Sequence, residues 1–197
     1  FGDNIEIILV EQDIESKLKD TTIFDKYIFT YSDRAFNRSW AFNVGTKLCT
    51  HDKIFYGDCD LIVPKNQINR AIRLLDDYGC VSPYKRVIDL TAYESLTVDK
   101  DKWVNITRDS RPGINLTGGV VGFKRSSFYE ISGWCEDFEG WGGEDDFQTW
   151  KVNKWLKSTE VSGDVYHLYH PRPQINRSLY VDNLNVLRKV KTMEFDD

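Results

Sequence analysis

The segment from Gly140 to Asp146 (GWGGEDD) constrains the fold of this chain more than any other stretch of its sequence. The residues after it place Phe147, Trp150 and Trp155 near one helical face, so the three acids are expected to form the first turn of a helix that packs inward. Acids are favoured there because the helix dipole is positive at its N-terminal end. Adjacent glycines weaken regular structure, and they are best explained by unusual backbone angles or by the close approach of another molecule.

The simplest alternative is that the acids only stabilise the helix, with Lys151, Lys154 and Lys157 toward its other end. Successive helical side chains point about 100° apart, so one or two of the acids can instead face a cleft while the third faces water. Helix stabilisation requires neither Trp141 nor paired glycines. We therefore favour a functional role for the whole segment.

The length and composition of the chain are those of one globular domain. Its 197 residues are enough for a full hydrophobic core, and 41% of them are hydrophobic. A net charge of −5 argues against a dedicated nucleic-acid binder. A few basic side chains are nevertheless enough to hold a nucleotide, so a small nucleotide ligand stays open.

Three observations bear on where the chain resides. No apolar run reaches the about 18 residues of a transmembrane helix, and the first residues do not read as a signal peptide. The sequon at Asn37 lies at the start of an apparent buried helix, where a glycan would clash. We therefore expect a soluble chain and lean toward a cytoplasmic location. The four cysteines lack short paired spacing, which argues against a zinc site and leaves disulfides open.

Apolar runs typical of buried strands alternate along the chain with helical patterns, which predicts an α/β domain. Strands are expected over residues 5–10, 27–29, 53–56, 61–63, 80–83, 113–123 and 161–169. Helices are expected over residues 36–48, 66–78, 126–132 and 144–156, near 90–96, and after a loop in the C-terminal segment 171–197. Gly45 is expected to pack against the strand that follows its helix, and Gly79 to end its helix. The polar excursion from 84 to 112 is expected to face substrate or to be mobile.

Asp58 and Asp60 lie between two apolar segments, separated by Cys59. A carboxylate next to a buried strand is costly unless it is paired or binds a cation. In an α/β protein the end of a strand is also the edge at which ligands bind. An Asp- and Gly-rich turn is the alternative, but the flanking strands favour a ligand site.

His167 and His170 supply a second set of possible metal ligands. A carboxylate with two imidazoles suits Mn²⁺ better than Ca²⁺, which prefers oxygen ligands. Residues three apart in a strand point to opposite faces, so the two histidines share a metal only if the strand ends between them. Pro171 is compatible with such an end. The alternative is a pair of unrelated surface histidines.

A metal site together with a separate carboxylate base suggests transfer from a nucleotide-activated donor. A bound metal stabilises charge on the departing diphosphate, while a base takes the proton of an acceptor hydroxyl. Two alternatives to a transferase are a nucleotide-sugar or carbohydrate-binding domain without activity and a metal-dependent phosphohydrolase. The Trp141 to Gly143 segment gives the phosphohydrolase little support.

The sequence resembles the metal-dependent glycosyltransferases of the GT-A fold, most closely the β-1,4-galactosyltransferase family and its chondroitin-synthase-like relatives. The matching motifs, in family order from about residue 5 to 172, are FNR at 36–38, NVG at 43–45, DCDLI at 58–62, GGV at 118–120, ISGW at 131–134, GWGGEDD at 140–146 and the histidine pair. The resemblance implies a GT-A, Rossmann-like α/β fold whose mixed, mainly parallel central sheet is flanked by helices. It also implies an inverting single displacement that moves galactose or N-acetylgalactosamine from a UDP-sugar to a glycan hydroxyl.

The resemblance also assigns roles to single residues. Asp145 matches the family's general base, with Glu144 beside it on the acceptor side. Asp60 and His170 match the Mn²⁺ ligands, and His167 stands where the galactosyltransferases have methionine, which keeps a side chain able to bind metal. The residues expected to bind the donor are Phe36, Arg38, Asp58, Cys59, Gly119, Trp141 and Asp146.

The chain departs from the family pattern in three places. The family's first strand, with its uridine-binding turn, would precede Ile5, so residues 1–197 are expected to form a single GT-A domain that lacks this strand. Asn115 to Thr117 stand where the galactosyltransferases have tyrosines, and the excursion from 84 to 112 is longer than expected. These differences affect the identity of the sugar and of the acceptor, and they leave the reaction class unchanged.

Overall fold

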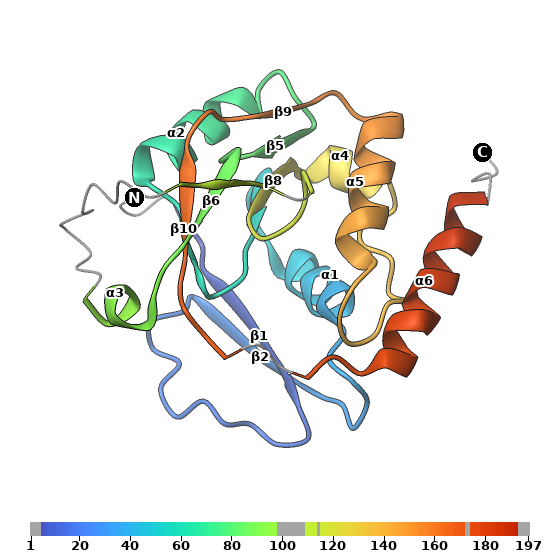
Figure 1. Cartoon of the computed structure of the whole chain (residues 1–197). Coiled ribbons are helices and arrows are strands. Elements are labelled where there is room, and N and C mark those ends of the chain that lie inside the picture. The colour runs from blue at the N-terminus through green and yellow to red at the C-terminus, as the bar shows by residue number, and fades with distance from the viewer. Residues whose placement is uncertain (1–4, 98–108, 114, 172–173, 193–197) are drawn as a thin grey trace.

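The computed structural model describes residues 5–97, 109–113, 115–171 and 174–192 (Figure 1). The strands are β1 (Ile8–Asp13), β2 (Lys26–Tyr31), β3 (Lys53–Tyr56), β4 (Leu61–Ile62), β5 (Cys80–Ser82), β6 (Arg86–Asp89), β7 (Arg111–Pro112), β8 (Val121–Lys124), β9 (Ser158–Glu160) and β10 (Asp164–His167). The helices are α1 (Arg38–Leu48), α2 (Lys65–Leu74), α3 (Ala92–Thr97), α4 (Arg125–Glu130), α5 (Glu144–Trp155) and α6 (Arg177–Thr192). Part of the predicted excursion, residues 98–108, lies outside the described residues. No helix in the described ranges combines the length and apolarity needed to cross a membrane.

The strands form three sheets, which confirms the predicted mixed α/β class. β1 pairs with β2, a second sheet has the order β4-β10-β6-β7, and a third has the order β3-β8-β5-β9. The pairs β1–β2, β6–β10 and β5–β9 are parallel, and the other four described pairs are antiparallel. Parallel pairing is therefore less dominant than expected. Figure 1 shows the strands in the middle of the molecule and α6 beside α5 at its outer edge.

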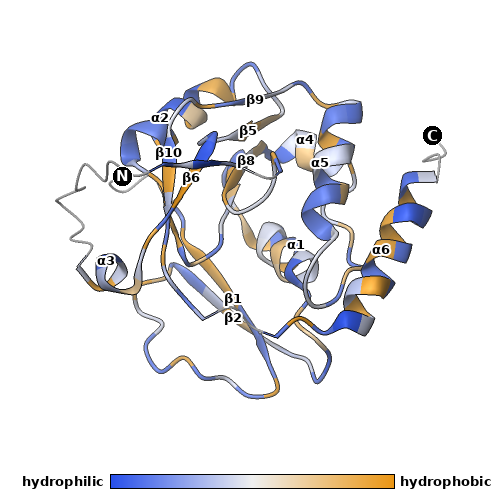
Figure 2. Cartoon of the chain, in the orientation of Figure 1, coloured by the Kyte–Doolittle hydropathy of each residue, from blue (hydrophilic) through white to orange (hydrophobic). Residues whose placement is uncertain are grey.

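An aromatic cluster forms the largest core and joins β3, β8 and α4. The ring of Tyr56 lies 5.2 Å from that of Phe128 and 5.9 Å from those of Phe123 and Trp134, measured between centroids. Phe123 is fully buried. Figure 2 shows apolar residues along the inner strands and a mixture of polar and apolar residues along α6. The cluster therefore packs the end of β3, from which the Asp58 turn leaves, against α4 and Trp134.

Helix α1 begins near the predicted position, but its burial differs from the prediction. The recurrence of apolar residues every four positions, at Phe36, Trp40, Val44 and Leu48, predicts one helical stripe. In the structure Phe36 is 52% exposed and Leu48 is 37% exposed. The fully buried side chains are those of Ser39, Ala41 and Thr46. Gly45 packs against Val10 of the preceding strand β1, 3.4 Å from where its Cβ would be, and not against the following strand. Neighbours on more than one side of α1 explain why burial does not follow a single stripe.

A further helix prediction needs correction, because α2 ends at Leu74 and not at Gly79. Gly79 follows a turn, where its amide donates to the carbonyl of Lys157. In α5, the side chain of Lys151 is buried. Its ammonium donates to the carbonyls of Ile131 and Gly133, which follow α4. Burial lowers the pKa of Lys151 to about 8.

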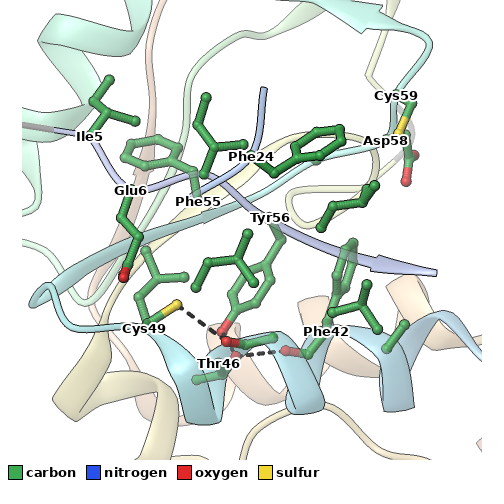
Figure 3. A pocket seen from close by; sticks show the side chains of 18 of the residues that line it. Ile5, Glu6, Phe24, Phe42, Thr46, Cys49, Phe55, Tyr56, Asp58 and Cys59 are labelled. Atoms are coloured by element: carbon green, nitrogen blue, oxygen red, sulfur yellow. Dashed lines mark hydrogen bonds between the residues drawn. The ribbon is translucent and has the colours of Figure 1, made fainter. Parts of the chain in front are cut away.

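A cavity of about 1330 Å³ lies between β1 and β3 (Figure 3). Among the described strands, β1 pairs only with β2 and β3 only with β8, so each has one unpaired edge. The cavity is lined by residues 5–10, by one side of α1, by β3, and by Ile68 and Ile72 of α2. It extends as far as Asp58, Asp60 and His170.

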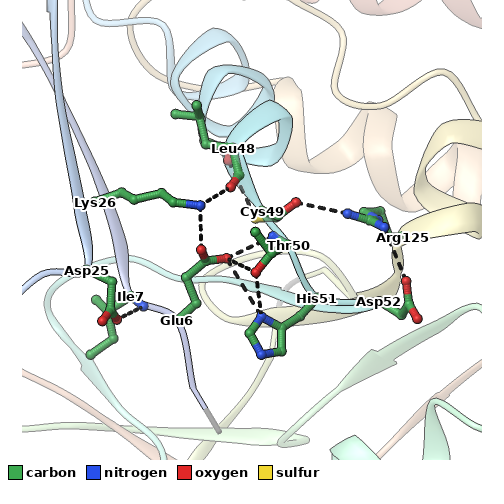
Figure 4. Close-up of polar contacts among 11 residues, drawn as sticks. Glu6, Ile7, Asp25, Lys26, Leu48, Cys49, Thr50, His51, Asp52 and Arg125 are labelled. Atoms are coloured by element: carbon green, nitrogen blue, oxygen red, sulfur yellow. Dashed lines mark hydrogen bonds and ion pairs between the residues drawn. The ribbon is translucent and has the colours of Figure 1, made fainter. Parts of the chain in front are cut away.

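A polar cluster around Glu6 (Figure 4) contributes Glu6, Cys49 and His51 to the lining of this cavity, and Glu6 lies on the side away from Asp58 in Figure 3. The Glu6 carboxylate lies 2.5 Å from the ammonium of Lys26 and accepts the backbone N–H of Thr50 at 2.9 Å. The hydrogen bond from Lys26 is the main cause that lowers the pKa of Glu6 to about 2. Glu6 therefore ties the start of β1 to β2 and to the segment after α1.

Replacing Phe123 by alanine tests the aromatic core. Deletion of a fully buried phenylalanine is expected to lower the free energy of unfolding by about 3–5 kcal/mol, from lost burial and the cavity left behind. Tyr93→Ala is the matched aromatic control, since Tyr93 is 75% exposed, and it is expected to cost less than about 0.5 kcal/mol. Urea unfolding followed by circular dichroism measures both. Similar losses in the two variants would contradict the assigned core.

Candidate functional site

Arg38 lies at the centre of the candidate site and links two of the sequence motifs. Its Nε donates to Asp58 Oδ1 at 2.9 Å, and its Nη1 donates to Asp145 Oδ1 at 2.5 Å. Its Nη2 donates to the carbonyl of Gly119 at 3.3 Å. The guanidinium also lies 4.7 Å from the ring centroid of Phe42. The end of β3 and the first turn of α5 are thus joined by one buried cation.

The turn at Gly118 and Gly119 forms one wall of the site. Gly119 has a φ of +76°, and a Cβ there would lie 2.4 Å from both the Leu61 side chain and the Tyr84 hydroxyl. That hydroxyl donates to the carbonyl of Gly118 at 2.5 Å. Backbone angle and space both require glycine at this position. The predicted strand over 113–123 accordingly begins only at Val121, after this turn.

The glycines of the GWGGEDD segment have a conformational explanation. Gly140, Gly142 and Gly143 all have positive φ, at +69°, +99° and +97°. A Cβ on Gly142 would lie 3.0 Å from the ring of Tyr180 on α6. Trp141 is 60% exposed, and its ring lies 5.7 Å from that of Tyr180. The predicted unusual backbone angles are therefore confirmed. The close approach to the glycines is made by the C-terminal helix α6 of the same chain.

The three acids form the first turn of α5, as predicted, and their environments differ. Burial raises the pKa of Asp145 to about 7, with the charges of Glu144 and Asp58 adding to the rise and Arg38 opposing it. Burial also raises the pKa of Glu144, whose Oε2 has no hydrogen-bond partner among the described residues. Thr117 donates to the backbone carbonyl of Asp145 at 3.0 Å and holds this turn. Asp146 is exposed.

Asp60, His167 and His170 come together as a possible metal site. One ligand atom from each lies within 4.8 Å of the others. The Nε2 atoms of His167 and His170 lie 3.5 and 3.2 Å from Asp60 Oδ2. Strand β10 ends at His167, so the chain turns before His170, as the shared site requires. One carboxylate and two imidazoles fit a divalent transition metal such as Mn²⁺.

Sequence reasoning missed the residues behind His167. Asp89 Oδ1 lies 2.9 Å from His167 Nδ1, and Arg111 donates to both oxygens of Asp89 at 2.6 and 2.9 Å. Arg111 is the main cause that lowers the pKa of Asp89 to about 2, with a smaller effect from His167. The sequence does contain an indication of Asp89. This acid follows the apolar pair Val87 and Ile88, in the same way as Asp58 comes after the apolar strand β3.

The other predicted residues lie around this centre. Phe36 lines the cavity beside β1, and its carbonyl accepts the N–H of Gly140 at 2.8 Å. Cys59 is exposed, and all four cysteines are free thiols. The side-chain oxygen of Asn37 accepts the N–H of Trp40 and caps α1, and the side-chain nitrogen donates to the carbonyl of Glu136 at 2.6 Å.

Comparison with known proteins gives similarity in both sequence and structure. The family model described as the N-terminal domain of galactosyltransferase matches residues 108–171. β-1,4-Galactosyltransferase 1 of Bos taurus is 31% identical over 115 residues, and that of Homo sapiens is 30% identical over 118 residues. These matches cover 56% and 58% of this chain. The chain spans about a quarter of the length of these relatives, 23% and 24%.

Solved structures show the same fold. GalNAc-T7, crystallised with UDP, GalNAc and Mn²⁺, aligns with a TM-score of 0.56 and 17% identity over 83% of this chain and 36% of its own. The catalytic domain of Drosophila β-1,4-galactosyltransferase 7, in complex with xylobiose, aligns with a TM-score of 0.53 and 15% identity over 96% of this chain and 82% of its own. The chain therefore has the GT-A fold, and its predicted resemblance to the β-1,4-galactosyltransferases is confirmed.

Gly119→Ala tests the wall of the site. The alanine Cβ would overlap Leu61 and Tyr84, and the left-handed backbone alone disfavours it by about 1–2 kcal/mol. We expect the free energy of unfolding to fall by more than about 2 kcal/mol, measured by urea unfolding. Gly57→Ala is the control, since its Cβ would make only ordinary contact with Val120 at 3.4 Å. Equal stability of the two variants would show that the turn does not require glycine.

Proposed function

We propose that this chain, which has the GT-A fold and resembles the β-1,4-galactosyltransferases, transfers a sugar from a UDP-sugar to a hydroxyl group of a glycan. Galactose and N-acetylgalactosamine are the favoured sugars. The observation that carries the proposal is the convergence on Arg38: it joins a buried carboxylate of raised pKa, Asp145, to the turn that also presents Asp60 to two histidines. A transferase needs these two functions next to one another.

The metal and donor side of the reaction would use the end of β3 and the chain after β10. Asp60, His167 and His170 would hold Mn²⁺. Bound there, Mn²⁺ would neutralise negative charge on the diphosphate of the donor. The presence of UDP and Mn²⁺ in the GalNAc-T7 structure supports this choice of ligand. The donor would be held by Phe36, Arg38, Asp58, Cys59, Gly119, Trp141 and Asp146.

Asp145 would act as the general base on the acceptor side, with Glu144 beside it. Arg38 holds Asp145 Oδ1, whereas Oδ2 lies next to Gly118, 3.4 Å from where a Cβ would be. Glycine therefore leaves room beside the oxygen that is outside the ion pair with Arg38. Asp145 would take the proton of the acceptor hydroxyl. The hydroxyl oxygen would bond to the anomeric carbon while the bond to UDP breaks on the opposite face. The product would have inverted configuration.

A second candidate is a nucleotide-sugar- or carbohydrate-binding domain without activity. The guanidinium of Arg38 is already engaged by two carboxylates and a carbonyl, which leaves it less available to stabilise charge on a departing diphosphate. Calorimetry separates the candidates. Binding of UDP that does not respond to Mn²⁺, with no turnover on any acceptor, would support the binding domain and contradict the transferase.

Asp145→Asn tests the base. Loss of the proton acceptor is expected to lower transfer by about 10²–10⁴-fold, with UDP binding nearly unchanged. In the parent, kcat/KM should rise with pH and level off above about 7, because only the ionised form of a group of raised pKa accepts a proton. The rate is measured as UDP released from UDP-galactose or UDP-GalNAc, with xylobiose as one of the acceptors.

Asp182→Asn is the control for this variant, since Asp182 is exposed on α6. It should match the parent in rate and in pH profile. Full activity of Asp145→Asn, or a parent rate that does not change between pH 5 and 8, would remove Asp145 as the base.

Metal dependence is tested by chelation and by His170→Ala. EDTA is expected to abolish transfer and Mn²⁺ to restore it, since one carboxylate and two imidazoles are ligands that fit this ion. His170→Ala should weaken Mn²⁺ binding by at least about tenfold in calorimetry, because it removes one of three ligands. His51→Ala is the matched control, as His51 is exposed and lies outside the cluster. Equal Mn²⁺ affinity in both variants would contradict the proposed site.

A further inference from the structure

The two histidines of the metal cluster are held in the same way. In each ring the Nδ1 atom faces an oxygen: the Asp89 carboxylate at 2.9 Å for His167, and the carbonyl of Pro171 at 3.2 Å for His170. In each ring the Nε2 atom faces Asp60 Oδ2. An imidazole whose Nδ1–H donates to an oxygen carries its free lone pair on Nε2, which is the form that binds a metal.

We propose that Asp89 is a positioning residue that sets the ring orientation and tautomer of His167 for metal binding, and that Arg111 holds Asp89 in place for this role. The proposal rests on the metal site of the proposed function. It adds two residues, from β6 and β7, that neither the motifs nor the resemblance assigns.

The sheet itself brings these side chains together. His167 and Asp89 are register partners in the parallel pair of β10 and β6. Arg111 pairs with Val87 in the adjoining antiparallel pair of β6 and β7. Both donors of Arg111, Nε and Nη2, point at the Asp89 carboxylate. A two-point contact of this kind fixes the plane of the carboxylate as well as its position.

The simpler explanation is an exposed ion pair without a role in the site, since the Asp89 side chain is 51% exposed. The same two strands provide a comparison. Arg86 of β6 donates to both oxygens of Asp164 on β10, at 2.9 and 3.3 Å, at the opposite end of the pairing. Asp164 is not in the metal cluster. It reproduces the chemistry of the Asp89–Arg111 pair without a histidine.

Asp89→Ala, with Asp164→Ala as its matched control, tests the proposal on the intact chain with Mn²⁺ alone. Second-sphere carboxylates of this kind change metal affinity by about 10–100-fold. We therefore expect calorimetry to show Mn²⁺ binding weakened at least tenfold in Asp89→Ala and unchanged in Asp164→Ala. Pulsed electron paramagnetic resonance of bound Mn²⁺ should show ¹⁴N coupling from two imidazoles in the parent and from one in Asp89→Ala. A purely structural role would not remove a single imidazole coupling.

The outcomes separate this proposal from the one on which it rests. No ¹⁴N coupling in the parent would overturn the metal site and the role of Asp89 together. Two couplings in the parent, with the affinity and couplings of Asp89→Ala equal to those of Asp164→Ala, would overturn the role of Asp89 alone. If Asp89→Ala does not fold, Asp89→Leu keeps the branched shape of the side chain while removing the oxygen that accepts from His167. Parent-like affinity and couplings in Asp89→Leu would then also overturn the positioning role.

Discussion

The contact on which the site depends is the ion pair between Arg38, whose side chain is 11% exposed, and the carboxylates of Asp58 and Asp145. A buried charge is costly unless its partners are well placed, and here all three donor groups of the guanidinium have an oxygen acceptor. Asp145 is 107 positions from Arg38 in the sequence, so the pair ties together distant parts of the chain. Removing the guanidinium would leave two neighbouring carboxylates without the counter-charge that they share. The geometry of the site is therefore cooperative.

The same region pushes the pKa values of two carboxyl groups in opposite directions. Asp145 lies among buried acids, and burial raises its pKa to about 7. Asp89 is more exposed and accepts hydrogen bonds from Arg111, and these hydrogen bonds lower its pKa to about 2. Environments that separate carboxyl groups in this way are how a protein assigns one to exchange protons and another to stay charged. The fold achieves this separation by removing Asp145 from water and by placing Asp89 against Arg111.

Local sequence patterns predicted most helices and strands. They did not predict which polar side chains would contact one another. The helix that starts at Glu144 and the strand before Asp58 follow from periodicity and breaker residues in a few consecutive positions, whereas β10 spans only Asp164–His167 of the strand predicted over 161–169. Asp89 and Arg111 were missed because they lie in a polar stretch with weak periodicity, and only sheet register brings them to a histidine. The burial predicted along α1 was wrong for a related reason, since a helix with neighbours on several sides does not bury a single apolar stripe. The proposed roles of the site residues stay predictions.

The cavity between β1 and β3 has a consequence for how the described part of the chain behaves. The amide of Lys26 bonds to the carbonyl of Ile7, so in the parallel ladder the backbone groups of alternate residues such as Ile8 face away from β2, toward the cavity. Unpaired edges that border apolar space recruit extended polypeptide, and proteins ordinarily cover them. Helices α1 and α2 both contribute to the lining, as they would around an interior strand. The facing edges of β1 and β3 are therefore the places, in the part of the chain that the structure describes, where an extended segment has backbone groups to pair with.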